Sequence, residues 1–208
     1  MIGSTPEFSQ KQLSIMRTKK AIYDSAINLF REYGYEKVKV EDIARVTGIS
    51  KGTFYLHYSS KVEILFEFYV QIDNFYMELE KESEYTGIQS PLEKLAYFSV
   101  RQAEYIEKIV TLDIARILYM NQIDKNNPGI SVLQKTRPHL RIISGLIEDG
   151  QKNGEILSTM SPDQLTCYVM NITRGFVYDW ILEDGSYSLT EDAKVYFPLI
   201  YKMLSSKC

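Results

Sequence analysis

The sequence predicts an all-α protein of about nine helices. Apolar residues recur at steps of three and four along most of the 208 residues, and no stretch of useful length alternates apolar and polar residues as a strand does. Several of these periodic stretches follow a serine that has proline next to it, or an acidic or amide side chain three residues later, as helix N-termini often do. With 45% hydrophobic and 25% charged residues, the chain can bury a sizeable core.

Three further observations limit the function. No apolar run approaches the ~18 residues of a membrane span and no signal peptide opens the chain, so we expect a cytoplasmic protein without a membrane partner. The two cysteines, Cys167 and Cys208, lie far apart, which favours a reducing compartment. Neither His57 nor His139 has a glutamate three residues before it, and the sequence has no glycine-rich phosphate loop or nucleophile motif. We therefore expect no enzyme, no metal site and no cofactor.

The first predicted helix covers residues 11–33. Residues 1–10 before it resemble a cloning junction, and we expect them to be disordered. Gly34 ends the helix, and its apolar stripe consists of Ile15, Ile22, Ala26, Leu29, Phe30 and Tyr33. Arg17 and Thr18 lie near its start, where they form either an ordinary solvated helix end or a clamp for a DNA phosphate.

Residues 38–58 contain a more specific pattern. A short apolar helix face there ends at Gly48, which tolerates the left-handed conformation that follows a helix end. Ser50 is a good N-cap for a second short helix over residues 51–57. Two short helices joined by a glycine-containing turn form a helix-turn-helix, whose second helix enters the DNA major groove. The stretch therefore predicts DNA binding.

Six more helices are predicted after this motif, at about residues 61–84, 91–106, 110–122, 132–153, 162–182 and 190–204. Serine N-caps open three of them, at Ser60, Ser90 and Ser161. Residues 85–87 and a loop at residues 126–129 should interrupt the helices. Pro138 marks either a kink or a helix start, and Pro198 is expected to kink the last helix.

Charge is distributed unevenly along the chain. The net charge is −3, yet residues 1–66 carry ten Lys and Arg against seven Asp and Glu, whereas the remaining residues carry fourteen against twenty. A basic head and an acidic body fit a DNA-binding domain at residues 11–66 that is joined to a second domain at residues 67–208.

Specific residues around the helix-turn-helix recur in one register. They are Ala26-Ile27-Asn28-Leu29-Phe30, Gly34-Tyr35, Val40-Glu41-Asp42-Ile43-Ala44, the run from Gly48 to Tyr58, Lys61 and Leu65. Together they resemble the N-terminal domain of the TetR family of bacterial transcriptional regulators, over about residues 15–66. After residue 70 the resemblance is only architectural. It implies a homodimer that places two heads on a palindromic double-stranded DNA operator, and an all-α body that binds a small effector.

The residue types agree with the DNA contacts that the resemblance implies. Lys51 and Thr53 lie near the start of the second helix, where side chains reach base edges, and Gly52 allows that helix to come close to the duplex. Tyr55 and His57 can donate to phosphate oxygens. Expected phosphate contacts also come from Lys61, at the next helix start, and from Arg17, Thr18 and Lys39. The expected core of the head is Ile43, Ala44, Ile49, Phe54 and Leu65.

Two residues depart from the TetR-like pattern. Lys39 stands where the family often has Ser or Thr, so the expected side-chain cap of the first short helix is missing, and Lys39 can instead reach a phosphate. Tyr58 stands where the family usually has Phe. A phenol keeps the packing and adds a hydrogen-bond donor, so we expect little cost.

The body is rich in aromatic residues, and polar side chains lie among them on the predicted helices. Each aromatic residue alone is best interpreted as ordinary core, but buried polar groups need partners or a ligand. We therefore expect a pocket for an apolar or aromatic molecule with one polar or charged group. Its predicted lining is Tyr97, Tyr105, Arg116, Tyr119, Met120, Asn171, Arg174 and Tyr178.

The helix predicted at residues 162–182 has two apolar faces. One face can serve the core of its own subunit, and the other, with the last helix, fits the same two helices of a second copy in a four-helix bundle. This is also the TetR-like interface. The predicted interface residues are Met170, Gly175, Val177, Ile181, Leu199 and Met203.

These expectations combine into a repressor that an effector releases from DNA. A shift of the helix at residues 61–84 would change the spacing of two heads that must sit about 34–36 Å apart in successive grooves. Two alternatives stay open from the sequence: a TetR-like activator, and a DNA-binding protein without a small-molecule effector.

Overall fold

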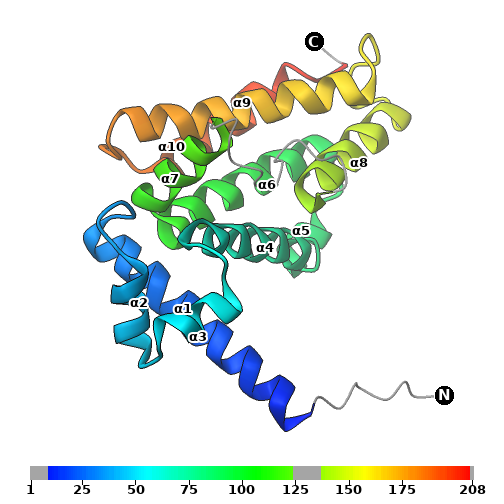
Figure 1. The fold of residues 1–208 in the computed structure, drawn as a ribbon. Coiled ribbons are helices and arrows are strands. Elements are labelled where there is room, and N and C mark those ends of the chain that lie inside the picture. The colour runs from blue at the N-terminus through cyan, green and yellow to red at the C-terminus, as the bar shows by residue number, and fades with distance from the viewer. Residues whose placement is uncertain (1–8, 124–136, 207–208) are drawn as a thin grey trace, which may run out of the picture. The chain divides into compact units, whose positions relative to one another are not determined.

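Ten α-helices and one π-helical turn form the residues that the computed structural model describes, 9–123 and 137–206 (Figure 1). These residues contain no β-strand, only an isolated antiparallel bridge between Ile156 and Ser205. The predicted all-α fold is therefore confirmed. The chain divides into two compact units, Met1–Glu67 and Phe68–Cys208. In the described ranges, no helix is both long and apolar enough to cross a membrane.

The first unit is built from short helices around one core. It contains α1 (Gln10–Tyr33), α2 (Val40–Thr47), α3 (Lys51–His57) and the first residues of α4 (Lys61–Leu79). Its fully buried side chains come from all four helices and from Tyr58 after α3, and they include Ile22, Phe30, Ile43, Phe54, Tyr58, Ile64 and Leu65. Of the predicted core residues of the head, only Ile49 is partly exposed.

The turn between α2 and α3 follows from two residues. Gly48 has φ 73° and ψ 28°, a left-handed conformation that would strain most other residues. The Ser50 hydroxyl oxygen accepts a hydrogen bond from the Thr53 amide at 3.0 Å and so caps α3. The predicted boundaries of both short helices are confirmed.

The second unit is a helical bundle around α6. It contains the rest of α4, then α5 (Ser83–Gly87), α6 (Pro91–Tyr105), the π-helical turn η1 (Ile106–Val110), α7 (Leu112–Ile123), α8 (Pro138–Lys152), α9 (Pro162–Leu182) and α10 (Leu189–Lys202). Helix α6 packs against α8 and α10, and α9 packs against α7 and α8 (Figure 1). The fully buried side chains of this second unit include Leu95, Phe98, Ile114, Ile147, Val169 and Phe197.

Several predicted boundaries of the second unit are confirmed. Ser161 forms the complete capping box with Gln164 at the start of α9. Pro138 is the first residue of α8, which settles it as a helix start. Pro198 lies inside α10, and its expected kink stays a prediction. The loop expected at residues 126–129 lies outside the described residues.

One predicted helix end was wrong, and two short elements were missed. Helix α4 ends at Leu79 instead of residue 84, and residues 85–87 belong to the short helix α5, which buries Tyr85. Helix α6 gives way to the turn η1, after which Thr111 has φ 69°. A positive φ at a β-branched residue is uncommon and strained, so the break before α7 has a defined position that periodicity does not reveal.

Candidate functional site

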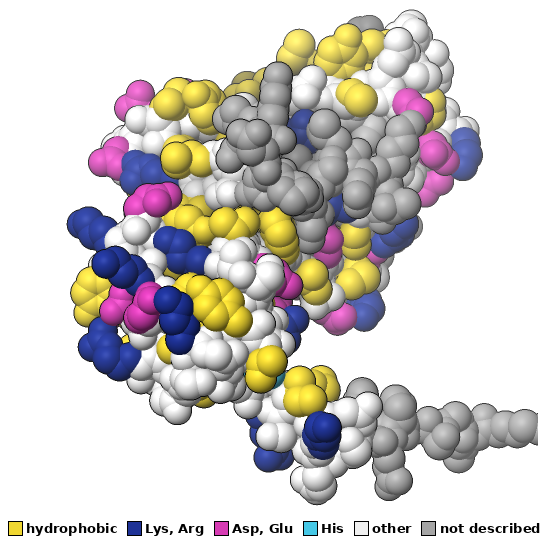
Figure 2. Space-filling view, in the orientation of Figure 1, with side chains coloured by type: hydrophobic (Ala, Val, Ile, Leu, Met, Phe, Trp, Pro, Cys, Tyr) yellow, Lys and Arg dark blue, Asp and Glu magenta, His cyan; other side chains and the backbone are white. Residues whose placement is uncertain are grey.

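Helix α3 presents a polar face with one apolar side chain to solvent. Phe54 is fully buried, whereas Tyr55 is 48% exposed and Leu56 is 84% exposed. A Cβ at Gly52 would meet only the Ser50 hydroxyl, at 3.7 Å, so packing within the head does not require glycine there. The absence of a side chain at this exposed position leaves room for a close partner. Figure 2 shows Lys and Arg side chains gathered over the first unit, with fewer acidic ones among them.

The Lys51 ammonium forms an ion pair with the Glu41 carboxylate of α2. This hydrogen bond raises the pKa of Lys51 and lowers the pKa of Glu41. Both side chains are more than half exposed, so solvent screens the pair and makes it easy to exchange for a phosphate or a base edge. Lys51 is therefore held at the start of α3 and stays chemically available.

Lys61 has internal partners. Its ammonium donates to the backbone carbonyl oxygens of Tyr35 and Val38, the latter at 3.1 Å, and lies 3.8 Å from the centre of the Tyr35 ring. Burial lowers the pKa of Lys61. Its side chain thus ties the start of α4 to the loop between α1 and α2, while the predicted phosphate contact stays a prediction.

A side chain inside α2 takes the place of the side-chain cap that Lys39 does not provide. The Asp42 carboxylate accepts a hydrogen bond from the Lys39 amide at 3.0 Å and also pairs with Arg45 at 2.9 Å. The bond to the Lys39 amide is the main reason why the pKa of Asp42 is lowered. The Lys39 side chain is therefore not needed for capping and lies exposed.

Tyr58, the second departure from the TetR-like pattern, has its donor satisfied. The phenol is 1% exposed and donates to the Glu67 carboxylate, which also pairs with Lys19 at 3.2 Å. Burial and this hydrogen bond both raise the pKa of Tyr58. The added hydroxyl therefore leaves no buried hydrogen-bond donor without a partner.

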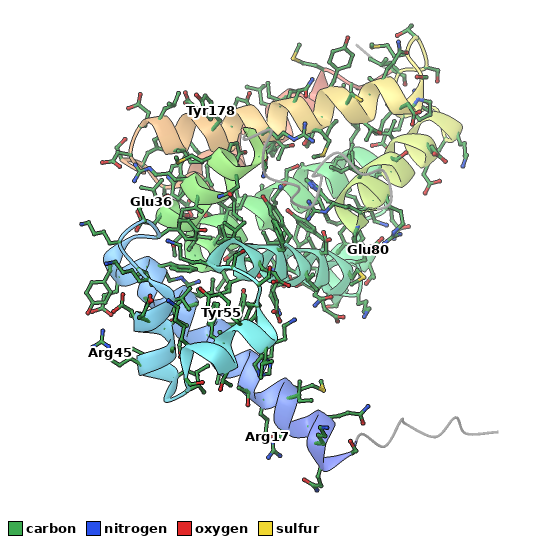
Figure 3. All side chains as sticks on the ribbon, viewed as in Figure 1. Arg17, Glu36, Arg45, Tyr55, Glu80 and Tyr178 are labelled. Atoms are coloured by element: carbon green, nitrogen blue, oxygen red, sulfur yellow. The ribbon has the colours of Figure 1, made fainter. Side chains whose placement is uncertain are left out.

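The remaining predicted DNA contacts lie on the surface of the first unit. Arg17 projects from the N-terminal half of α1 and Tyr55 from α3 (Figure 3). Thr18 donates to the Ser14 carbonyl oxygen at 3.0 Å. His57 is partly exposed, and the Thr53 hydroxyl shares a 2.9 Å hydrogen bond with Ser50. Leu56 was not among the predicted residues, although a step of four residues places it on the same outward helix face as Gly52.

A cavity of about 100 Å³ lies inside the second unit. Its walls come from α4, α6, η1, α7, α8 and α9. The apolar part includes Ile72, Ile106, Val110, Ala115, Leu118, Met170 and Val177. The polar or amphipathic part includes Tyr69, Tyr76, Gln102, Tyr119, Gln122, Arg137, His139, Thr173 and Arg174.

The cavity wall carries two cations and one partner carboxylate. Arg137 is held by Asp73 at 2.9 and 3.3 Å, and these side chains are 10% and 21% exposed. In the described part of the chain, no carboxylate lies within ion-pairing distance of Arg174. Burial raises the pKa of Tyr119, and the positive charge of Arg174 opposes this effect. The Arg174 guanidinium therefore lies close to this wall. The wall is therefore positive overall.

His139 is a neutral member of the same wall. Its ring stacks on Tyr76 and Phe98, with ring centres 4.6 and 5.5 Å apart. Burial, together with the charges of Arg137 and Arg174, lowers the pKa of His139 to about 3. Groups of three or more residues that could hold a metal ion are absent from the described residues.

Only two of the eight predicted pocket residues, Tyr119 and Arg174, line the cavity. Tyr97 instead hydrogen-bonds to Glu82 and Glu84, and Arg116 pairs with Asp184. Tyr105 stacks on Phe75 with ring centres 4.1 Å apart. The other three predictions were wrong because the side chains are exposed, namely Met120, Asn171 and Tyr178. Tyr178 is labelled on α9 in Figure 3.

Large apolar side chains are exposed on α9 and α10, among polar ones. They are Tyr168, Tyr178, Leu182, Val195, Tyr196, Leu199 and Met203. Of the predicted interface residues, Gly175, Leu199 and Met203 are exposed and Ile181 is partly exposed. Met170 and Val177 were assigned to the wrong face, because they are 5% and 3% exposed and line the cavity.

Comparison with known proteins gives two family matches that meet at residue 68. The family described as "Bacterial regulatory proteins, tetR family" matches residues 22–68. The family described as "YsiA-like protein, C-terminal region" matches residues 68–203.

Known relatives extend over most of the chain. This chain is 24% identical over 177 residues to the fatty acid metabolism regulator protein of Bacillus subtilis (strain 168). That match covers 81% of this chain and 86% of the relative. The chain is 21% identical over 193 residues to the probable acrEF/envCD operon repressor of Escherichia coli (strain K12), covering 90% and 87%.

A solved structure shows the same fold. FadR from Bacillus subtilis in complex with stearoyl-CoA matches with a TM-score of 0.73 at 22% identity, over 88% of this chain and 97% of that one. Because the match to the C-terminal region alone spans more than half of the chain, and the match to the head precedes it, this protein belongs to the tetR family of bacterial DNA-binding transcriptional regulators.

Proposed function

We propose that this regulator is a repressor that leaves its operator when a small molecule with an apolar body and an anionic group binds in the cavity of the second unit. The single observation that carries this proposal is Arg174, a cavity-wall cation that has no carboxylate partner among the described residues. A buried or half-buried cation favours an anion as its partner, because an unpaired charge in such a place is costly.

The rest of the wall fits this ligand class. None of the described residues that line the cavity is acidic, and seven of them are Ala, Val, Ile, Leu or Met. An apolar pocket with a few convergent polar groups is the usual form of a small-molecule site. The FadR structures with stearoyl-CoA and lauroyl-CoA also hold ligands that combine an apolar chain with anionic groups, which supports the same class here.

The small size of the cavity supports an effector whose binding changes the conformation of the second unit. Its volume of about 100 Å³ lies below the roughly 300–1,000 Å³ of pockets for drug-sized molecules. For a larger effector to be enclosed in the cavity, the walls must move. Such a ligand binds the expanded state better than the compact one, and this difference in affinity is what shifts a conformational equilibrium.

The outward surface of α9 and α10 supports a homodimer on a palindromic operator. Leu199 and Met203 are 63% and 70% exposed, and Gly175 on α9 would let a neighbouring helix approach closely. A two-fold pair of these helices would bury both surfaces in a four-helix bundle. The mass of the protein in solution, measured by light scattering, checks this assembly.

The test is DNA release by carboxylates. An operator duplex is first selected by the full-length protein from a random DNA library, and fluorescence polarisation then measures its release. We expect aromatic or alkyl carboxylates to release the DNA, and their uncharged alcohols or amides to do so at least about tenfold less well, since a charge-assisted bond is lost.

Variants at Arg174 show whether the cavity is responsible. Arg174→Met should weaken the carboxylate response about tenfold or more, whereas Arg174→Lys keeps the charge and part of the response. Arg141→Met is the matched control, because Arg141 is an exposed arginine paired with Glu80 and does not line the cavity. Release that is equal in all three variants would contradict the proposal.

A further inference from the structure

Two buried polar atoms of the cavity wall have no hydrogen-bond partner among the described residues. They are Gln102 Oε1 on α6 and His139 Nε2 on α8, and both residues line the cavity. Gln102 is 8% exposed, so more than nine-tenths of it is buried. Because buried polar atoms in folded proteins are nearly always paired, two orphans in one cavity indicate a missing partner.

The surroundings fix the orientation of both groups. Burial raises the pKa of Tyr76, and the nearby Gln102 amide opposes this effect, as expected if the N–H side of the amide faces the phenol. The carbonyl oxygen of the same amide is then left over. The His139 ring stacks on the Tyr76 and Phe98 rings, whose own centres are 5.2 Å apart, and His139 also lines the cavity.

We propose that the effector carries a neutral hydrogen-bond donor, a hydroxyl or an N–H group, that binds Gln102 Oε1 and His139 Nε2 at a place separate from its anionic group. This inference rests on the proposed function and deepens it. It assigns the effector to the hydroxylated or N–H-bearing organic acids, instead of acids with a plain hydrocarbon body.

The donor requirement follows from the chemistry of the two atoms. An amide oxygen only accepts, so a carboxylate, an ether or a hydrocarbon cannot satisfy Gln102 Oε1. A neutral imidazole can offer either a donor or an acceptor at Nε2, depending on its tautomer. A hydroxyl can donate to Gln102 Oε1 and can also accept from His139 Nε2 in the tautomer that carries the proton there, so a hydroxyl suits both atoms of this cavity.

An ordered water is the competing partner. A single buried water commonly makes about three hydrogen bonds to such atoms and could hold both in the absence of effector. A ligand hydroxyl that displaces this water gains affinity by restoring both bonds, whereas a water that stays in place makes the wall indifferent to ligand hydroxyls.

The experiment compares compact acids that differ only at one ring position. Isothermal titration calorimetry measures binding of benzoate, 3-hydroxybenzoate, 4-hydroxybenzoate and 4-methoxybenzoate to the full-length protein. We expect the better hydroxybenzoate to bind about tenfold more tightly than benzoate, as one net hydrogen bond allows. The methoxy compound, which cannot donate, should show no such gain.

Two variants locate the effect. Gln102→Met keeps the length of the side chain without the acceptor and should remove the hydroxyl preference, so that the hydroxybenzoates bind no more tightly than benzoate to that variant. His139→Phe keeps the stacking and should reduce the preference. If either variant fails to fold, the comparison of benzoate with the hydroxybenzoates on the unmodified protein still decides the proposal.

The possible outcomes are distinct. A hydroxyl preference that Gln102→Met abolishes supports the inference. Binding of benzoate without any hydroxyl preference, or a preference that survives in Gln102→Met, overturns the inference and leaves the proposed function standing. Failure of all four acids to bind counts against both.

Discussion

The surface of the head and the wall of the cavity both use polar side chains, but they treat them in opposite ways. On the head, two of the cations that are expected to meet DNA already have protein partners, since Lys51 has Glu41 and Lys61 has two backbone carbonyls. In the cavity, Arg174 has no carboxylate among the described residues, and Gln102 and His139 keep unpaired atoms.

Solvent explains the difference. An exposed pair such as Lys51 and Glu41 is stabilised little and can be exchanged at little cost when a stronger anion arrives. A buried unpaired atom is costly in every state without a ligand, so it raises the free energy of the empty protein relative to the bound one. The head is thus arranged for reversible exchange, and the cavity is arranged to need an occupant.

The test with the largest expected effect breaks the ion pair between Arg137 of the cavity wall and Asp73. Asp73→Asn should lower the free energy of unfolding by about 3 kcal/mol, because Arg137 would stay buried without its partner. Chemical denaturation measures this change. Glu80→Gln is the control, since it breaks the more exposed pair with Arg141 and should cost less than about 1 kcal/mol. Equal losses in the two variants would remove the distinction between buried and exposed pairs.

The next test uses the pH dependence of stability. The pKa of His139 is lowered to about 3 in the folded protein, whereas an unfolded chain has an ordinary histidine pKa of about 6.5. Between these values the unfolded state binds the proton and the folded state does not, so stability falls as the pH falls. From pH 6.5 to pH 5.0 we expect a loss of about 1.5–2 kcal/mol from this residue.

Variants that each replace one of the two histidines isolate that contribution. Denaturant unfolding at pH 5.0, 6.5 and 7.5 should show the extra loss in the wild type and not in His139→Phe. His57→Gln, on the partly exposed surface of α3, should keep the wild-type profile. An unchanged pH profile in His139→Phe would show that the ring is paired and solvated after all, which would also weaken the contrast with the head.

The smallest expected effect concerns the head. Glu41→Gln frees Lys51 from its exposed ion pair, so operator affinity should rise about twofold to fivefold. Fluorescence polarisation at fixed salt measures it. Glu36→Gln removes the same charge from the loop between α1 and α2, where no ion pair of Glu36 occurs among the described residues, and should produce a smaller gain. If both variants gain equally, net charge and not release of Lys51 controls the affinity.

The sequence predicted the local structure of the head well because that structure depends on local chemistry. Gly48 and Ser50 fix the turn through backbone conformation and capping, and both effects act within a few residues. The spacing of apolar residues also located nine of the helices. The turn η1 and the short helix α5 were missed, since neither has a periodic pattern of its own.

The cavity could not be predicted because it depends on which helix faces meet. Helix α9 is apolar on more than one side, so its sequence did not show that Met170 and Val177 face inward while Tyr178 faces outward. A single step along a helix turns a side chain by about 100°, which is enough to exchange cavity for surface. Gln102, Arg137 and His139 gained their importance only through the convergence of α6 and α8.

Residues of the turn η1 have two different roles, so substitutions there can have two different consequences. Ile106 and Val110 line the cavity, whereas the Glu107 carboxylate between them accepts hydrogen bonds from the Leu189 and Thr190 amides, at 3.0 and 3.1 Å, and so caps the start of α10. Substitutions at residues 106 and 110 can therefore alter ligand preference while the support of α10 is kept. In a family whose members respond to different compounds, such a division lets new specificity arise without rebuilding the subunit surface.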